Sequence, residues 1–141
     1  MTIINKKIDD TNKETSGKIL GLDYGTRRIG LAISDAGQSQ AFAYDTLEVS
    51  GKTFDQIKKI CDKELIDKIV VGLPLGLSGE YTAKTEEVIC FIEALENQTK
   101  IVVETEDERL SSVEAMGRKD GQGIDEGAAQ IILQQYIDQR C

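Results

Sequence analysis

Hydrophobic positions near the start of the chain alternate with small or polar ones, as β-strands require. An apolar run at residues 19–22 ends in Asp23, and after a short turn three apolar residues alternate with small ones: Ile29, Leu31 and Ile33. Because Gly25 permits a tight turn between the two runs, they predict a β-hairpin. Residues 41–49 predict a third strand.

Further along, the spacing of apolar residues switches between helical and strand patterns. A helical period over residues 54–65 is formed by Phe54, Ile57, Ile60, Cys61 and Leu65. The continuous apolar run at 68–73, which Pro74 ends, predicts a buried parallel strand. After a glycine-containing loop at 75–80, a second helical pattern carries Val88, Ile89, Phe91, Ile92 and Leu95. Residues 101–103 begin a fifth strand.

The C-terminal part predicts two helices. Ser111 followed by Glu114 is a capping-box signal for a short helix, and residues 125–140 predict a longer one. One face of the longer helix carries Asp125, Ala128, Ala129, Ile132 and Tyr136, and its small alanines permit close packing on a sheet. The order of elements predicts an α/β fold: a mixed five-stranded sheet flanked by helices, antiparallel in its first three strands and parallel in the later ones.

Length and composition suit one domain. Residues 1–16 are polar and lack a sustained hydrophobic period, which predicts a flexible tail before a domain at 17–141. No run approaches the roughly 18 apolar residues that span a bilayer, so a cytoplasmic protein without a membrane partner is expected. The three widely spaced cysteines predict buried or incidental thiols rather than a disulfide framework or a zinc site.

Charge and the lack of histidine narrow the chemistry further. A chain with no histidine cannot use histidine-dependent nucleophiles or histidine-ligated metals. The net charge of −8 means that any binding to nucleic acid needs a local basic patch or a bound divalent metal. The glycine turn supplies such a patch, because Thr26 is followed by the adjacent arginines Arg27 and Arg28.

Acidic residues follow or precede several of the predicted elements. Asp23 ends the first strand, Asp107 and Glu108 follow the fifth, and Asp125 opens the last helix. In a sheet of this order the carboxyl ends of the first, fourth and fifth strands meet at one edge, where ligands gather. Three carboxylates around one or two divalent ions could activate water and stabilise the oxygens of a phosphodiester.

Each of these acids also has a simpler interpretation. Asp23 could cap its own turn, and Asp125 could stabilise the start of its helix. Asp107 with Arg109 could form a surface ion pair, and the acidic run at 104–108 could be solvated surface. Their joint placement at the ends of elements favours the metal site.

Four ordered segments carry a resemblance to a known family. They are residues 22–30 (LDYGTRRIG), 70–75 (VVGLPL), 107–112 (DERLSS) and 125–129 (DEGAA). In this order they resemble the YqgF family of bacterial RNase H-like Holliday-junction resolvases, and the likeness extends from Lys18 to the C-terminus.

The resemblance implies an RNase H-like nuclease of the bacterial cytoplasm that uses Mg²⁺ or Mn²⁺ and matures the 5′ end of pre-16S ribosomal RNA. Its partner would be nucleic acid, either structured RNA or branched DNA. Carried onto this chain, the candidate catalytic and metal-binding acids are Asp23, Glu108 and Asp125. The candidate nucleic-acid contacts are Thr26, Arg27, Arg28 and Arg109.

The chain departs from the family pattern at three places. RNase H-like nucleases generally take their second acid from the end of the fourth strand, but Gly72-Leu73-Pro74 stands there, so Glu108 must substitute. Gly76 occupies a position where the family usually has asparagine. The loop at 121–123 has fewer basic residues than usual.

Other functions stay open at this point. Processing of RNA is favoured over cleavage of junctions, because resolvases need symmetric dimers and nothing in the sequence specifies one. A sugar-kinase or actin-like nucleotide-binding module would need two related halves, and 141 residues hold only one. A catalytically idle RNase H-like domain that binds a protein partner is the third possibility.

Overall fold

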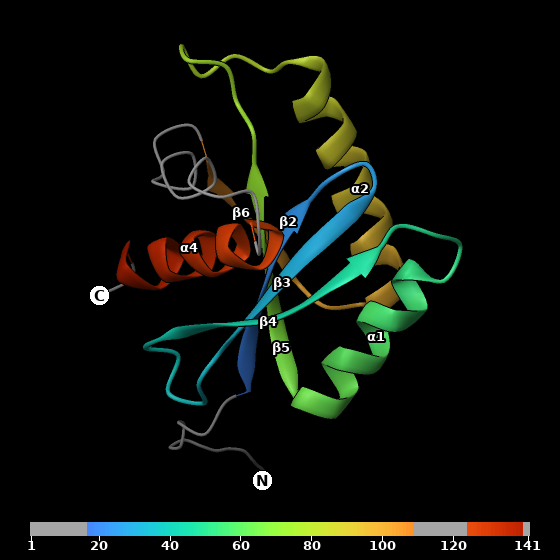
Figure 1. The fold of residues 1–141 in the computed structure, drawn as a ribbon, viewed down its shortest axis with the longest axis vertical. Helices are drawn as coiled ribbons and strands as arrows, with labels where there is room; N and C mark the ends of the chain where they lie inside the picture. Colours follow the sequence, from blue (N-terminus) through green and yellow to red (C-terminus); the bar gives the residue numbers. More distant parts are fainter. Residues whose placement is uncertain (1–16, 109–123, 140–141) are drawn as a thin grey trace, which may run out of the picture.

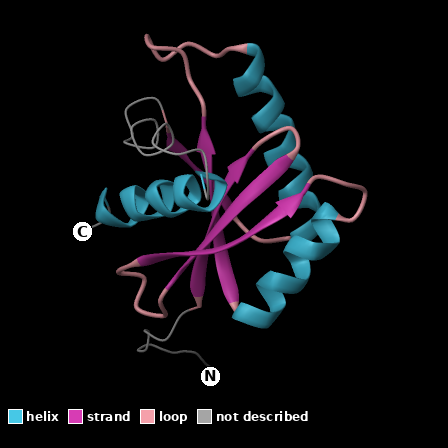
Figure 2. Cartoon of the chain, in the orientation of Figure 1, coloured by secondary structure: helices cyan, strands magenta, loops and turns pink. Residues whose placement is uncertain are grey.

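The computed structural model describes residues 17–108 and 124–139, which form one mixed sheet with helices on both faces (Figures 1 and 2). The strands are β2 (Lys18–Tyr24), β3 (Arg28–Ser34), β4 (Ala41–Glu48), β5 (Ile66–Leu73) and β6 (Val103–Asp107). The helices are α1 (Thr53–Glu64), α2 (Ala83–Thr99) and α4 (Ile124–Gln139). The sheet has the order β4-β3-β2-β5-β6.

The pairing directions confirm the mixed sheet expected from the sequence. Strands β4, β3 and β2 are antiparallel neighbours, whereas β2, β5 and β6 run parallel. As a result β2, β5 and β6 end at the same edge of the sheet (Figure 1). The helix expected after Ser111 and the tail at 1–16 lie outside the described residues. No helix in the described part of the chain has a stretch long and apolar enough to cross a membrane.

The fifth strand differs from its prediction. The apolar residues 101–103 lead into β6, but the strand itself has the acidic sequence VETED. Its backbone pairs with β5 from Val103, opposite Ile69, to Asp107, opposite Leu73. Because β6 is an edge strand, backbone pairing rather than an apolar side-chain pattern defines it.

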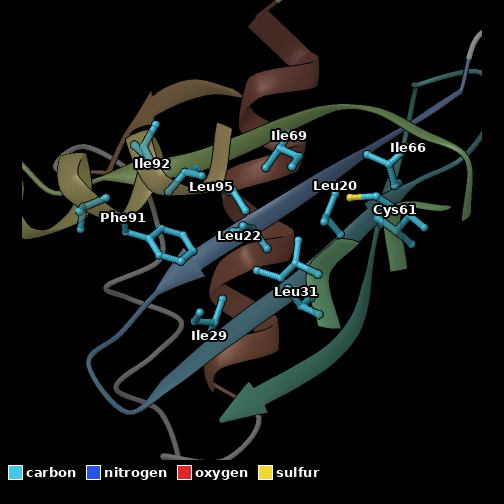
Figure 3. Packing of buried hydrophobic residues seen from close by; sticks show 14 residues of the cluster. Leu20, Leu22, Ile29, Leu31, Cys61, Ile66, Ile69, Phe91, Ile92 and Leu95 are labelled. Atoms are coloured by element: carbon cyan, nitrogen blue, oxygen red, sulfur yellow. The ribbon is translucent and has the colours of Figure 1, made fainter. Parts of the chain in front are cut away.

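The two faces of the sheet carry separate apolar clusters. Leu20 and Leu22 of β2 face α1 and α2, where they pack in one cluster with Ile57, Leu95 and Phe91; Figure 3 shows this face with α4 behind the strands. Ile19 of β2 instead belongs to the cluster that contains Ala129, Ile132 and Leu133 of α4. Strand alternation therefore assigns the side of Gly21 and Asp23 to the α4 face.

Close packing of α4 depends on Gly21 in the middle of β2. A Cβ atom at this position would lie 2.8 Å from Cβ of Leu133 and 3.3 Å from the carbonyl oxygen of Ala129. Ala129 lies at this contact, and both it and Ala128 are buried, as their small size predicts. The helix thus lies directly against the backbone of the strand that carries Asp23.

We expect Gly21→Ala to lower the free energy of unfolding by about 1–3 kcal/mol, because the added methyl group meets a side-chain stem that cannot rotate away. Gly51→Ala is the matched control, since a Cβ there meets no atom within 4 Å, and it should change stability by no more than about 0.5 kcal/mol. Urea unfolding of both variants measures the difference. Equal free energies of unfolding for Gly21→Ala and Gly51→Ala would show that α4 can shift away from β2 at little cost.

Candidate active site

Asp23 and Glu108 come from two strands that are not neighbours. Asp23 is the penultimate residue of β2, and Glu108 follows the last residue of β6, with β5 between these strands. The register pairs Leu22 with Val71 across β2 and β5, and Gly72 with Glu106 across β5 and β6. Gly72 therefore lies between the two acidic positions at the edge of the sheet.

The missing side chain of Gly72 provides the space that Glu108 occupies. A Cβ atom at Gly72 would lie 2.7 Å from Oε2 and 2.9 Å from Cδ of Glu108. The backbone N–H of Glu108 donates to the carbonyl of Leu73 at 3.2 Å, which continues the β5–β6 ladder past the end of the strand. The carboxylate of Glu108 is thereby held over the backbone of β5, where the fold would otherwise place a fourth-strand side chain.

Strand alternation organises the acidic segment 104–108. The alternative interpretation of this segment as solvated surface does not hold for Glu104 and Glu106. Glu104 accepts a hydrogen bond from the Tyr136 hydroxyl and lies 3.6 Å from the Lys68 ammonium. Glu106 is only 5% exposed and accepts hydrogen bonds from Gln135 and Gln139 of α4, both at 2.8 Å.

The same alternation separates Glu108 from Asp107. Glu104 and Glu106 face α4, and Glu108 continues this series onto the side of the sheet where Asp23 lies. Asp107 falls on the alternate series, and it is the carbonyl of Asp107 that accepts from Gln135, at 3.4 Å. The structure thus brings Glu108 rather than Asp107 to the face of Asp23.

Glu108 titrates in an unusual range. Burial raises the pKa of its carboxyl to about 7; the negative charges of Asp23 and Asp107 add to the rise, and the Lys84 ammonium opposes it. A carboxyl pair with this much unfavourable charge is suited to bind a cation, because carboxylate oxygens are the ligands that Mg²⁺ prefers. Within the described residues, no cluster of three or more candidate metal ligands is complete.

The third predicted acid, Asp125, is the second residue of α4, and its side chain lies outside the described part of the structure. Its backbone is one helical turn before Ala129, whose carbonyl faces Gly21 of β2. The first half of α4 therefore lies against the strand that carries Asp23. Arg109 also lies outside the described residues.

The basic turn forms a concave surface beside the acids. Thr26, Arg27 and Arg28 are all exposed, and with Glu48 and Val49 they line a polar pocket of about 250 Å³. The turn is closed by a 2.9 Å hydrogen bond from the N–H of Gly25 to the carbonyl of Arg28. Glycine is required there for this close approach, since a Cβ atom would lie 2.7 Å from the Arg28 oxygen.

Lys84 is a residue that the sequence analysis missed. It is the second residue of α2, and its ammonium lies 5.6 Å from the centre of the Tyr24 ring and close enough to Glu108 to lower its pKa. A capping box between Thr82 and Thr85 begins the helix, and the Thr85 hydroxyl donates to the carbonyl of Pro74, just after β5. The Thr82–Thr85 spacing after the glycine loop was the signal that places Lys84 at this edge.

Known proteins resemble this chain in sequence. The family model described as "RuvX: Holliday junction resolvase" matches residues 17–139. A protein of Maridesulfovibrio salexigens named "Putative pre-16S rRNA nuclease" is 38% identical over 131 residues, which cover 85% of this chain and 97% of that protein. A protein of Leifsonia xyli subsp. xyli with the same name is 40% identical, over 87% of this chain and 86% of its own length.

Solved structures show the same fold at low sequence identity. Thermus thermophilus RuvC in complex with a Holliday junction substrate superimposes with a TM-score of 0.58 at 13% identity, over 88% of this chain and 95% of RuvC. The fowlpox virus resolvase bound to junction DNA gives a TM-score of 0.54 at 11% identity, over 87% and 98% of the two chains. The sheet is thus the RNase H-like sheet of these resolvases. The family match and the similarity to these relatives show that this chain belongs to the RuvX (YqgF) family.

Proposed function

We propose that this chain is a metal-dependent endonuclease that hydrolyses phosphodiester bonds, with the 5′ end of pre-16S ribosomal RNA as its substrate. The observation that carries the proposal is the carboxyl of Glu108, placed over Gly72 and close enough to Asp23 for the Asp23 charge to raise its pKa. Relatives named for pre-16S rRNA and 38–40% identical over most of this chain support the choice of RNA. Such a substrate places the protein in the cytoplasm.

The residues present fit a divalent cation, Mg²⁺ or Mn²⁺. Asp23 and Glu108 offer carboxylate oxygens from one face of the sheet, and Asp125 would add a third from the first turn of α4. A bound cation supplies positive charge against the charge that develops on the phosphodiester in the transition state. Lys84 contributes a further positive charge at the same edge and so favours a phosphate beside Glu108.

Glu108 also couples the site to pH. With its pKa near 7 the carboxyl holds a proton for part of the time at neutral pH, and cation binding requires that it release this proton. Asp23 and Asp107 disfavour the ionised form of Glu108, whereas Lys84 favours it. The balance among these charges sets the pH at which the site can be loaded.

Cleavage of branched DNA is the second candidate function. The family description and the fold shared with junction-bound resolvases favour it. RNA and four-way junctions should therefore be tested side by side. A catalytically idle domain would cleave neither substrate.

We expect Asp23→Asn to reduce single-turnover cleavage at saturating Mg²⁺ by at least about 100-fold, because it removes one ligand charge and keeps the size of the side chain. The melting temperature should not fall, since one of two repelling carboxylates is neutralised. Asp62→Asn, at an exposed position of α1, is the matched control and should cleave normally. Cleavage by Asp23→Asn at the wild-type rate would refute the proposed site.

Glu108→Gln should reduce metal-dependent cleavage far more than Asp107→Asn, because only Glu108 lies over Gly72 on the face of Asp23. Losing a ligand removes several kcal/mol of charge stabilisation from the transition state. Asp107, in contrast, acts on the site only through its charge. Single-turnover rates of the two variants on the same substrate decide the assignment. Comparable losses would mean that both carboxylates hold the cation.

The stability of the cation-free protein should depend on pH through Glu108. A carboxyl whose pKa is about 7 in the folded protein and near its usual 4.5 when unfolded stabilises the fold below pH 4.5, and this contribution is lost as pH rises to 7. Between about pH 5 and pH 8, the melting temperature of wild type should therefore fall more than that of Glu108→Gln. Glu93→Gln, at an exposed position of α2, should behave as wild type.

Adding Mg²⁺ at pH 8 provides the second half of this measurement. The cation should raise the melting temperature of wild type by binding the folded state, and should raise that of Glu108→Gln much less. Parallel melting curves for wild type and Glu108→Gln at every pH would show that Glu108 carries no raised pKa.

A further inference from the structure

A second concave site lies on the opposite face of β2 from Asp23. It is a cavity of about 410 Å³ between the end of β2, the segment that joins β4 to α1, and α2. Tyr24, Phe54 and Phe91 line it, together with Val49 and the exposed Cys90. Its volume is within the range of small-molecule sites, and nothing in the nuclease chemistry described above uses it.

The aromatic rings in this cavity are arranged nearly parallel. Tyr24 and Phe91 stack with ring centres 4.4 Å apart and planes 29° apart, and Phe54 and Phe91 are 5.6 Å and 21° apart. Tyr24 and Phe54 are only partly buried, so their rings contribute to the wall of the cavity. Aromatic walls of this kind bind flat ring systems by stacking, whatever the identity of the ring.

Positive charges lie near two of the residues that line the cavity, Tyr24 and Val49. Lys84 lies over the Tyr24 ring at 5.6 Å and also acts on Glu108, so it stands between the cavity and the acids. The polar pocket with Arg27 and Arg28 shares Val49 with the cavity. Inside the cavity the charged residue is Glu87, which disfavours a phosphate there.

A flat, uncharged group with an anionic group on each side is the pattern of one nucleotide within a strand. We propose that this cavity binds a single unpaired nucleobase of the substrate, with the neighbouring phosphates at Lys84 and at Arg27–Arg28. The proposal rests on the nuclease function, because Tyr24 directly follows Asp23 and so sets the base beside the bond to be cleaved.

A cavity that binds an unpaired base makes the enzyme discriminate between substrates by their secondary structure. A base inside a duplex must be unstacked and unpaired before it can enter a pocket, and the cost is smallest where the nucleotide is already unpaired. We therefore expect the enzyme to prefer strands with an unpaired nucleotide at the cleavage site over continuous duplex. It also explains how a chain of net charge −8 holds nucleic acid, since stacking adds to the few local cations.

The test uses a short single-stranded RNA that carries 2-aminopurine, and the same RNA with an abasic site at that position. Binding to wild type should quench the 2-aminopurine fluorescence, and the abasic strand should bind roughly 5- to 100-fold more weakly. The same two strands made as DNA show whether the sugar matters. Equal affinity for intact and abasic strands, without quenching, would overturn the proposal.

Cys90→Trp and Phe54→Leu alter the cavity, Asn97→Trp is the control, and all three leave the acids untouched. Cys90→Trp fills it from α2, and Asn97→Trp adds the same side chain at an exposed position of that helix, away from the cavity. Cys90→Trp should abolish the preference for the intact strand, and Asn97→Trp should keep it. Phe54→Leu keeps the apolar volume but removes one aromatic face, so it should weaken quenching even if Cys90→Trp fails to fold.

Binding and cleavage measurements together distinguish the nucleobase site from the nuclease function. Asp23→Asn should still quench the fluorescence while it no longer cleaves. Cleavage by wild type with no difference between intact and abasic strands would overturn the nucleobase site and leave the nuclease standing. Base-dependent binding without cleavage of RNA or junctions would do the reverse. Binding of a protein partner in place of the oligonucleotide, blocked by Cys90→Trp, would also overturn the nucleobase assignment.

Discussion

The arrangement of the candidate site depends on backbone that is left bare on the α4 face of the two central strands. At Gly21 the missing side chain lets α4 approach β2, and at Gly72 it leaves room for both Ile132 of α4 and the carboxylate of Glu108. The packing of α4 and the placement of Glu108 therefore both depend on glycines in the two strands. A side chain at position 72 would compete with a core residue and with a catalytic candidate for the same volume.

Much of the fold could be predicted because its central strands are apolar and its helices have clear periods. The parallel placement of β2 and β5, and hence the proximity of Asp23 to the acids at the end of β6, follows from element order alone. The sequence was less informative where backbone pairing or tertiary contact decides the outcome. β6 begins at Val103 instead of residue 101, and buried Glu106 was not distinguishable from its exposed neighbours until Gln135 and Gln139 were seen to hold it.

The site residues show the same division. Asp23, and Asp107 together with Glu108, could be named from their places at the ends of strands, and the family resemblance chose Glu108. That the carboxylate of Glu108 lies over Gly72 is a volume relation that no local pattern contains. Lys84 and the stacked rings of Tyr24, Phe54 and Phe91 come from elements far apart in the sequence. Adjacent residues of β2 lie on opposite faces of the sheet, so the acidic site and the aromatic cavity are both at the end of this strand.

The acidic edge strand β6 has a consequence for assembly. An exposed edge offers unpaired backbone groups to any other extended chain, and edge-to-edge pairing of this kind leads to aggregation. In β6 three of five residues are carboxylates, so a second copy of the same strand would bring like charges against one another. The acidic residues of β6, which precede Glu108, therefore disfavour pairing of this edge with the same strand of a second copy.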